Sequence, residues 1–164
     1  HPSYYNLVYS LASNSLLILR SFFTSPQNNC PLPSCNPCGG TPLYDAIGMG
    51  IAKINALTTE DDSVLVTIIT DGEENCSEEY DLKMIKNLIE KLKKQNWTFT
   101  FIGTDDLDVE NIAHGMGIDN HLQFSEDEAG TKAMFARENR ARERYNKCRA
   151  MDCKMEAGSY FEEK

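Results

Sequence analysis

A continuous apolar run that ends in acidic residues constrains the fold of this chain more than any other feature. The residues Val64-Leu65-Val66-Thr67-Ile68-Ile69-Thr70 are followed directly by Asp71-Gly72-Glu73-Glu74. A run without alternation of polar and apolar residues is typical of a strand inside a parallel sheet that is covered on both faces. Such a strand would place Asp71 at the carboxyl edge of the sheet, where open α/β sheets bind their ligands.

Strand-like runs and helical periodicities alternate along the rest of the chain. The predicted elements are a hairpin of strands at 4–9 and 16–19, a proline-rich loop at 25–38, a helix from Thr41 to Leu57, the strand at 64–69, a helix capped by Ser77, a strand at 97–102, a short helix at 109–114, an edge strand at 121–124 and a final helix at 126–149. This alternation predicts an α/β fold with a Rossmann-like, doubly wound, mostly parallel sheet flanked by helices.

Length and charge limit the domain count and the kinds of partner. A chain of 164 residues fits one domain, which we expect to span residues 1–150, with 151–164 as a C-terminal tail. The net charge of −9 argues against nucleic acid and anionic membranes as partners, because both require a basic surface. No apolar stretch approaches the ~20 residues that a membrane span needs, so we expect no membrane insertion. The sequence indicates no cellular compartment.

The cysteines leave three interpretations open. They are Cys30, Cys35, Cys38, Cys76, Cys148 and Cys153. An even number permits disulfides if the protein is exported. The spacing of the first three is also compatible with a zinc site, although it offers only three thiolates. Thiols in a cytosolic protein are the simplest alternative.

A threonine at the head of a helix is the natural counterpart of Asp71. Thr41 follows Gly39-Gly40 and precedes Pro42, so it suits the N-cap position, with proline at the first helical position. The two glycines would let the backbone approach closely or adopt a positive φ. A hydroxyl and a carboxylate at one sheet edge form an oxygen-only site, which favours Mg²⁺, Mn²⁺ or Ca²⁺ over zinc.

Two segments of the chain resemble loops of the von Willebrand factor A family. The segment 40–46 (Gly-Thr-Pro-Leu-Tyr-Asp-Ala) is similar to the family's threonine loop, and 70–75 (Thr-Asp-Gly-Glu-Glu-Asn) to its aspartate loop. The sequences of these segments are most similar to those of a bacterial branch of the family, and the resemblance extends from about Tyr4 to Phe135. It implies a protein-binding module without catalysis, built around a metal-ion-dependent adhesion site. Thr41 and Asp71 would be metal ligands there, and a carboxylate of a protein partner would complete the coordination.

The chain departs from this family in its third loop. The family's first strand ends in Asp-x-Ser-x-Ser, whereas the only comparable segment here is Leu11-Ala12-Ser13-Asn14-Ser15, which lacks the acid. Ser13 and Ser15 are therefore the weaker candidate ligands. Too few residues separate Ser15 from Gly40 for a helix and two strands, which need roughly 30–35 residues. We favour residues 4–19 as the family's second and third strands. An upstream segment would then complete the sheet, and the chain alone would be poorly soluble or oligomeric.

Other functions compete with the adhesion site. The main rival is a structural scaffold with a degenerate, metal-free site, stapled by Cys30, Cys35 and Cys38. A magnesium-dependent phosphohydrolase ranks below both, because the glycine loop lacks the lysine of a phosphate cradle. Around the site, we interpret Glu73 and Glu74 as a solvated acidic rim. Asp45 would face solvent or cap its own helix.

Overall fold

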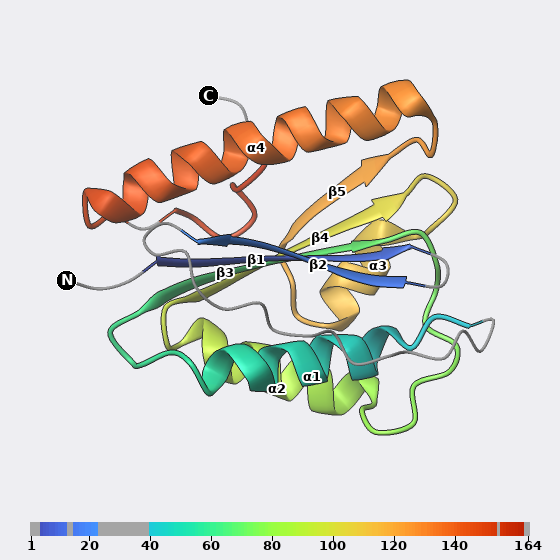
Figure 1. The fold of residues 1–164 in the computed structure, drawn as a ribbon, viewed down its shortest axis with the longest axis horizontal. Helices are drawn as coiled ribbons and strands as arrows, with labels where there is room; N and C mark the ends of the chain where they lie inside the picture. Colours follow the sequence, from blue (N-terminus) through green and yellow to red (C-terminus); the bar gives the residue numbers. More distant parts are fainter. Residues whose placement is uncertain (1–3, 13–14, 23–39, 154, 163–164) are drawn as a thin grey trace.

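The computed structural model describes the backbone of residues 4–12 and 15–22, and both backbone and side chains of residues 40–153 and 155–162. Within these residues, five strands form one sheet in the order β2-β1-β3-β4-β5 (Figure 1). Their bounds are Tyr4–Ala12 for β1, Ser15–Phe22 for β2, Ser63–Thr70 for β3, Trp97–Thr104 for β4 and Asn120–Phe124 for β5. Among the described strand pairs, β1–β2 is antiparallel and the other three are parallel. The predicted hairpin and the predicted parallel strands are confirmed.

In the described part of the chain, four helices cover the two faces of this sheet. They are α1 (Leu43–Asn55), α2 (Leu82–Lys93), α3 (Val109–Gly115) and α4 (Glu128–Ala150). Figure 1 shows α1, α2 and α3 on one side of the sheet and the long α4 on the other. The α/β class is thereby confirmed, and the three-layer arrangement is compatible with a Rossmann-like fold.

Strand β3 is buried along its entire length, as its uninterrupted apolar run predicts. Val64, Val66 and Ile68 belong to the core cluster beneath α1, α2 and α3. Leu65 and Ile69 belong to the second core cluster, beneath α4. Because successive side chains of a strand point to opposite faces, one strand contributes to both cores and fixes the position of Asp71 at its end.

The sheet is continuous on the other side of β3 as well. β1 pairs with β3 from Tyr4↔Ser63 to Leu11↔Thr70, without an additional strand between them. Leu11 pairs with Thr70 and Ala12 pairs with Ser15, so β1 ends and β2 begins at the same edge of the sheet as Asp71. Completion of the sheet by an upstream segment stays a prediction.

The helix caps differ from those expected. The N-cap of α1 is Pro42 and not Thr41, and it makes no side-chain capping bond. The hydroxyl of Thr41 is turned instead toward Gly72. Helix α2 begins at Leu82 with Asp81 as its N-cap, and the Asp81 side chain accepts a 2.7 Å hydrogen bond from Met84 N–H. Ser77 is therefore not the N-cap. The backbone N–H groups that follow it donate instead to the carboxylate of Asp45.

The end of the chain packs against the sheet, although the sequence led us to expect a tail. We call residues 155–162, which follow α4 and its closing turn, the return segment. Tyr160 and Phe161 of this segment are buried in the second core cluster. Helix α4 is strongly polar and contributes only a few buried side chains, so these aromatic rings supply apolar contacts that the helix does not.

Candidate metal site at the carboxyl end of the sheet

Thr41 and the Asp71-Gly72 pair lie side by side, as the sequence predicts. Thr41 directly precedes Pro42, the N-cap of α1, and Asp71 directly follows the last residue of β3. A Cβ atom added to Gly72 would stand only 2.5 Å from Thr41 Oγ1. The threonine hydroxyl therefore rests on the backbone of the residue next to Asp71, and only glycine leaves room for it.

A tight turn fixes Asp71 at the end of its strand. The Thr70 hydroxyl donates to Gly72 O at 2.9 Å, and the same hydroxyl oxygen accepts from Gly72 N–H at 3.2 Å. Asp71 is the residue enclosed by these two bonds. It is half-buried, and its Oδ1 atom is shielded from solvent. The turn thus holds the carboxylate at the rim before any ligand arrives.

Asn75 links the two loops through their backbones. Its side-chain Oδ1 accepts a 2.8 Å hydrogen bond from Thr41 N–H, and its own N–H donates to Thr41 O at 3.2 Å. A Cβ on Gly40 would lie 2.5 Å from Asn75 Oδ1 and 2.8 Å from Cys76 Sγ. Gly40 is therefore required for close approach of the two loops, and its φ is not positive.

Asp45 has a role that sequence reasoning missed. Its carboxylate accepts three backbone N–H bonds, from Glu78 at 2.8 Å, Glu79 at 2.9 Å and Tyr80 at 2.7 Å. It neither faces solvent alone nor caps its own helix, but ties the segment before α2 to the first turn of α1. The sequence signal for this role is weak, since the donors lie more than thirty residues away along the chain.

Glu74 also differs from the solvated acid that we expected. Its Oε1 accepts from Cys76 N–H at 3.0 Å and Ser77 N–H at 2.8 Å, and its Oε2 accepts from Tyr44 N–H at 2.9 Å. The Ser77 hydroxyl donates a 2.6 Å bond to Oε2. Burial, and secondarily the charge of Glu74, raise the pKa of the Tyr44 hydroxyl. Glu73, by contrast, is exposed as predicted.

The remaining candidate residues are less completely described. Ser13 lies outside the residues that the structure describes, and Ser15 is described only as the first residue of β2, paired with Ala12. Cys30, Cys35 and Cys38 also lie outside, so their predicted cluster stays a prediction. Asp105 and Asp106, at the end of the neighbouring strand β4, are exposed.

Thr41 and Asp71 offer the right kind of ligand atoms for a divalent cation, but two ligands do not complete its coordination. A hydroxyl and a carboxylate are ligands that Mg²⁺ and Mn²⁺ accept. Among residues 40–153 and 155–162, however, no three His, Cys, Asp or Glu side chains form a group that could hold a metal. Asp45 and Glu74 are engaged with backbone N–H groups. Further oxygens would have to come from water, from residues outside the described ranges, from an upstream segment or from a partner.

Comparisons of the chain with protein-family models, with curated proteins and with solved structures give no significant match. In the described part of the chain, no helix is both long and apolar enough to cross a membrane.

Proposed function

We propose that this chain is a protein-binding module of the von Willebrand factor A type that binds its partner through a divalent cation, Mg²⁺ or Mn²⁺ with Ca²⁺ as a further possibility. The observation that carries the proposal is the contact between the Thr41 hydroxyl and Gly72, beside Asp71, at the carboxyl end of β3. It brings the two candidate ligands, which are thirty positions apart in the sequence, to one rim.

Preorganisation of the two loops supports this proposal. Asp45, Glu74 and Asn75 join the head of α1 to the loop after β3 through hydrogen bonds of 2.7 to 3.2 Å. None of the three needs to be a metal ligand for this purpose. Their task would be to hold Thr41 and Asp71 in place, so that binding requires little ordering of the backbone.

The resemblance implies a carboxylate as the partner's group, and the charge of this chain means that such a group could bind only through the cation. Glu73 is exposed beside the site and the chain carries a net charge of −9, so an acidic partner would be repelled by the cation-free rim. A bound divalent cation supplies local positive charge and an open coordination position. A carboxylate from a protein partner would match this positive charge and fill the open coordination position.

Two parts of the protein could supply the missing ligands. The pairs Leu11↔Thr70 and Ala12↔Ser15 support Ser15 as one source, because β1 ends and β2 begins at the same edge of the sheet as Asp71; Ser13, outside the described residues, stays a candidate from the sequence alone. An upstream segment ending in Asp-x-Ser-x-Ser is the alternative. A chain extended upstream would bind the cation more tightly than this one only in the second case.

Titration calorimetry with MgCl₂ and MnCl₂ tests the proposal. We expect Asp71→Asn to weaken binding by at least about tenfold, because it removes a charged ligand. Glu73→Gln removes the same charge from an exposed neighbour and is the matched control, with an expected change below about threefold. Equal effects of the two substitutions would show that Asp71 acts only through general charge.

The metal-free scaffold is the competing function, and the lack of a three-ligand group among the described residues favours it. A scaffold would give no heat with either cation and no difference between Asp71→Asn and the unmodified chain. Elemental analysis adds a second distinction, since zinc bound by Cys30, Cys35 and Cys38 would indicate the stapled scaffold.

A further inference from the structure

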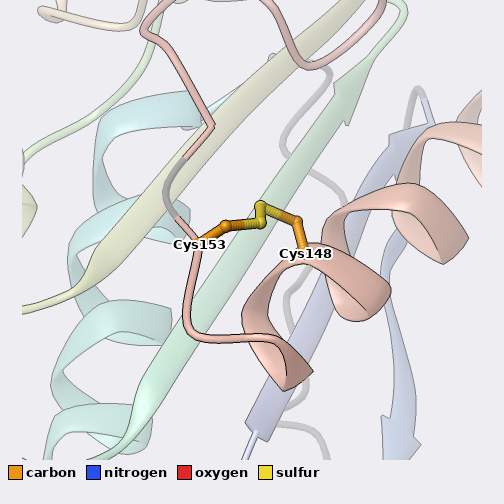
Figure 2. Close-up of a disulfide and its surroundings, with 2 residues drawn as sticks. All are labelled: Cys148 and Cys153. Carbon is orange, nitrogen blue, oxygen red and sulfur yellow. A yellow bond between two sulfur atoms is a disulfide. The ribbon is translucent and has the colours of Figure 1, made fainter.

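A disulfide joins the end of α4 to the loop that follows it. Cys148 lies in the last turn of α4, and Cys153 lies in the exposed loop (Figure 2). Their Cα atoms are 5.0 Å apart, within the usual range for a disulfide.

The two cysteines occupy the two key positions of a helix-ending motif. Cys153 N–H donates to Cys148 O at 2.9 Å, and Asp152 N–H donates to Arg149 O at 3.0 Å. Asp152 between them has a φ of 55°, in the left-handed region. These are the paired bonds of a Schellman motif, in which an apolar contact commonly joins the positions held here by the cysteines. The disulfide replaces that contact with a covalent bond.

The bridge directs the return segment onto the sheet. Beyond it, Tyr160 N–H donates to Asn120 Oδ1 at 3.1 Å. Arg144 and Arg137 of α4 donate to the carbonyl oxygens of Tyr160 and Phe161 at 3.0 and 3.1 Å. Side chains at its far end and a disulfide before its near end therefore hold this segment.

The beginning of the return segment lines a pocket. Met155, Glu156 and Ala157 form this wall of the pocket, which Trp97 and Thr98 at the start of β4 also line. Glu156 and Ala157 are exposed. Met155 packs against the second core cluster, so Glu156 and Ala157 are the part of the wall that side-chain packing holds least.

We propose that the Cys148–Cys153 pair is a thiol–disulfide exchange site that controls the closure of this pocket. Oxidised, the bridge keeps the turn at Asp152 and holds the wall in place. Reduced, the turn rests on hydrogen bonds and on a left-handed residue that is not glycine, so the wall separates readily from β4.

A dithiol reductant is the co-reactant that this step requires. One reductant thiolate attacks the exposed Cys153 sulfur, the S–S bond breaks, and Cys148 leaves as a thiolate that takes up a proton. The second reductant thiol then displaces Cys153 as a thiol and closes the reductant's own disulfide. Two electrons and two protons pass to the protein, and the reductant is oxidised.

Hydrogen exchange of the full 164-residue chain tests this inference, with Cys30, Cys35, Cys38 and Cys76 replaced by serine so that one pair remains. Dithiothreitol should speed exchange in residues 155–162 by at least about tenfold, because a disulfide that closes even a short loop restricts the open state. Fluorescence of Trp97, the only tryptophan, should change in parallel. The same chain with Cys148→Ser and Cys153→Ser is the control and should exchange fast with or without dithiothreitol.

Three results would overturn the inference. One is air-oxidised protein that keeps the mass of two free thiols. Another is exchange in residues 155–162 that does not respond to dithiothreitol. The third is loss of protection throughout β3 and α1 on reduction, which would make the bridge a global staple rather than a local device.

Discussion

The backbone N–H of Tyr80 donates a 2.7 Å hydrogen bond to the carboxylate of Asp45, across thirty-five positions of sequence. The bond joins the segment before α2 to the first turn of α1. Because Thr41 leads into α1 and Asp71 begins the loop that runs to Tyr80, this bond acts together with those of Asn75 and Glu74 to hold the two candidate metal ligands near each other.

Replacing Asp45 by asparagine should therefore destabilise the fold. Asp45→Asn removes the charge and one of the two acceptor oxygens that serve three N–H donors, so we expect a loss of about 1–3 kcal/mol in the free energy of unfolding. Urea denaturation measures it. Asp105→Asn, at an exposed position, should change stability by no more than about 0.5 kcal/mol. Equal losses in the two variants would contradict the assigned role of Asp45.

The packing of Gly48 against Tyr80 gives a second prediction. A Cβ on Gly48 would lie 2.5 Å from the Tyr80 ring, so Gly48→Ala should destabilise by about 1–3 kcal/mol despite the better helix propensity of alanine. Gly115→Ala in α3, where the nearest atom is 3.9 Å away, should be neutral or stabilising. A double-mutant cycle with Tyr80→Leu should recover part of the loss. Additivity in that cycle would rule out the ring as the cause.

Much of the fold is predictable because its information is local. The run from Val64 to Thr70 specifies a buried strand, and the helical periodicities on either side specify its neighbours. The pairing of Thr41 with Asp71 follows from topology, since both lie at the carboxyl end of one sheet. These parts of the sequence agree at every level from pattern to packing.

The sequence did not predict hydrogen bonds or packing between residues that lie far apart along the chain. Ser77 has the composition of an N-cap, but Asp45 and Glu74 already bind the N–H groups around it, so α2 starts four residues later at its own cap Asp81. Tyr160 and Phe161 read as part of a polar tail because no helical or strand period surrounds them. Because α4 is strongly polar and buries few side chains, it leaves apolar sheet surface uncovered, and Tyr160 and Phe161 cover that surface.

Stability should also depend on the protonation of Glu138. Burial raises the pKa of this carboxyl above its ordinary 4.5, against the lowering effects of Arg142 and of the Tyr160 hydroxyl. The folded protein then binds the proton more tightly than the unfolded chain. The contribution of Glu138 to stability is therefore fully present below pH 4.5 and is lost as pH rises through the raised pKa.

Glu138→Gln isolates this effect. The variant cannot ionise, so its stability relative to the unmodified chain should increase as the pH is raised from below 4.5 toward neutrality. Denaturation at a series of pH values measures the difference, in which the titration of all other carboxyls cancels. A difference that stays constant, or decreases, over this range would contradict a raised pKa.

The turn after α4 offers a stabilising substitution. Asp152 has a φ of 55°, which glycine adopts without the steric penalty of a side chain. Asp152→Gly should therefore raise the free energy of unfolding by about 0.5–1 kcal/mol. Asp152→Val should lower it by about 1 kcal/mol or more. Thermal denaturation of the oxidised protein measures both. Equal stabilities for glycine and valine would mean that this conformation is not retained in solution.

The most direct test of the central claim is a double-mutant cycle for Mn²⁺ binding, followed by electron paramagnetic resonance, with Thr41→Val and Asp71→Asn. If both residues bind one cation, each substitution alone should weaken binding, and the double variant should lose less than the sum of the two, with a coupling of about 1 kcal/mol or more. Unmodified protein that leaves the free Mn²⁺ signal unchanged, or two effects that simply add, would contradict a shared metal site.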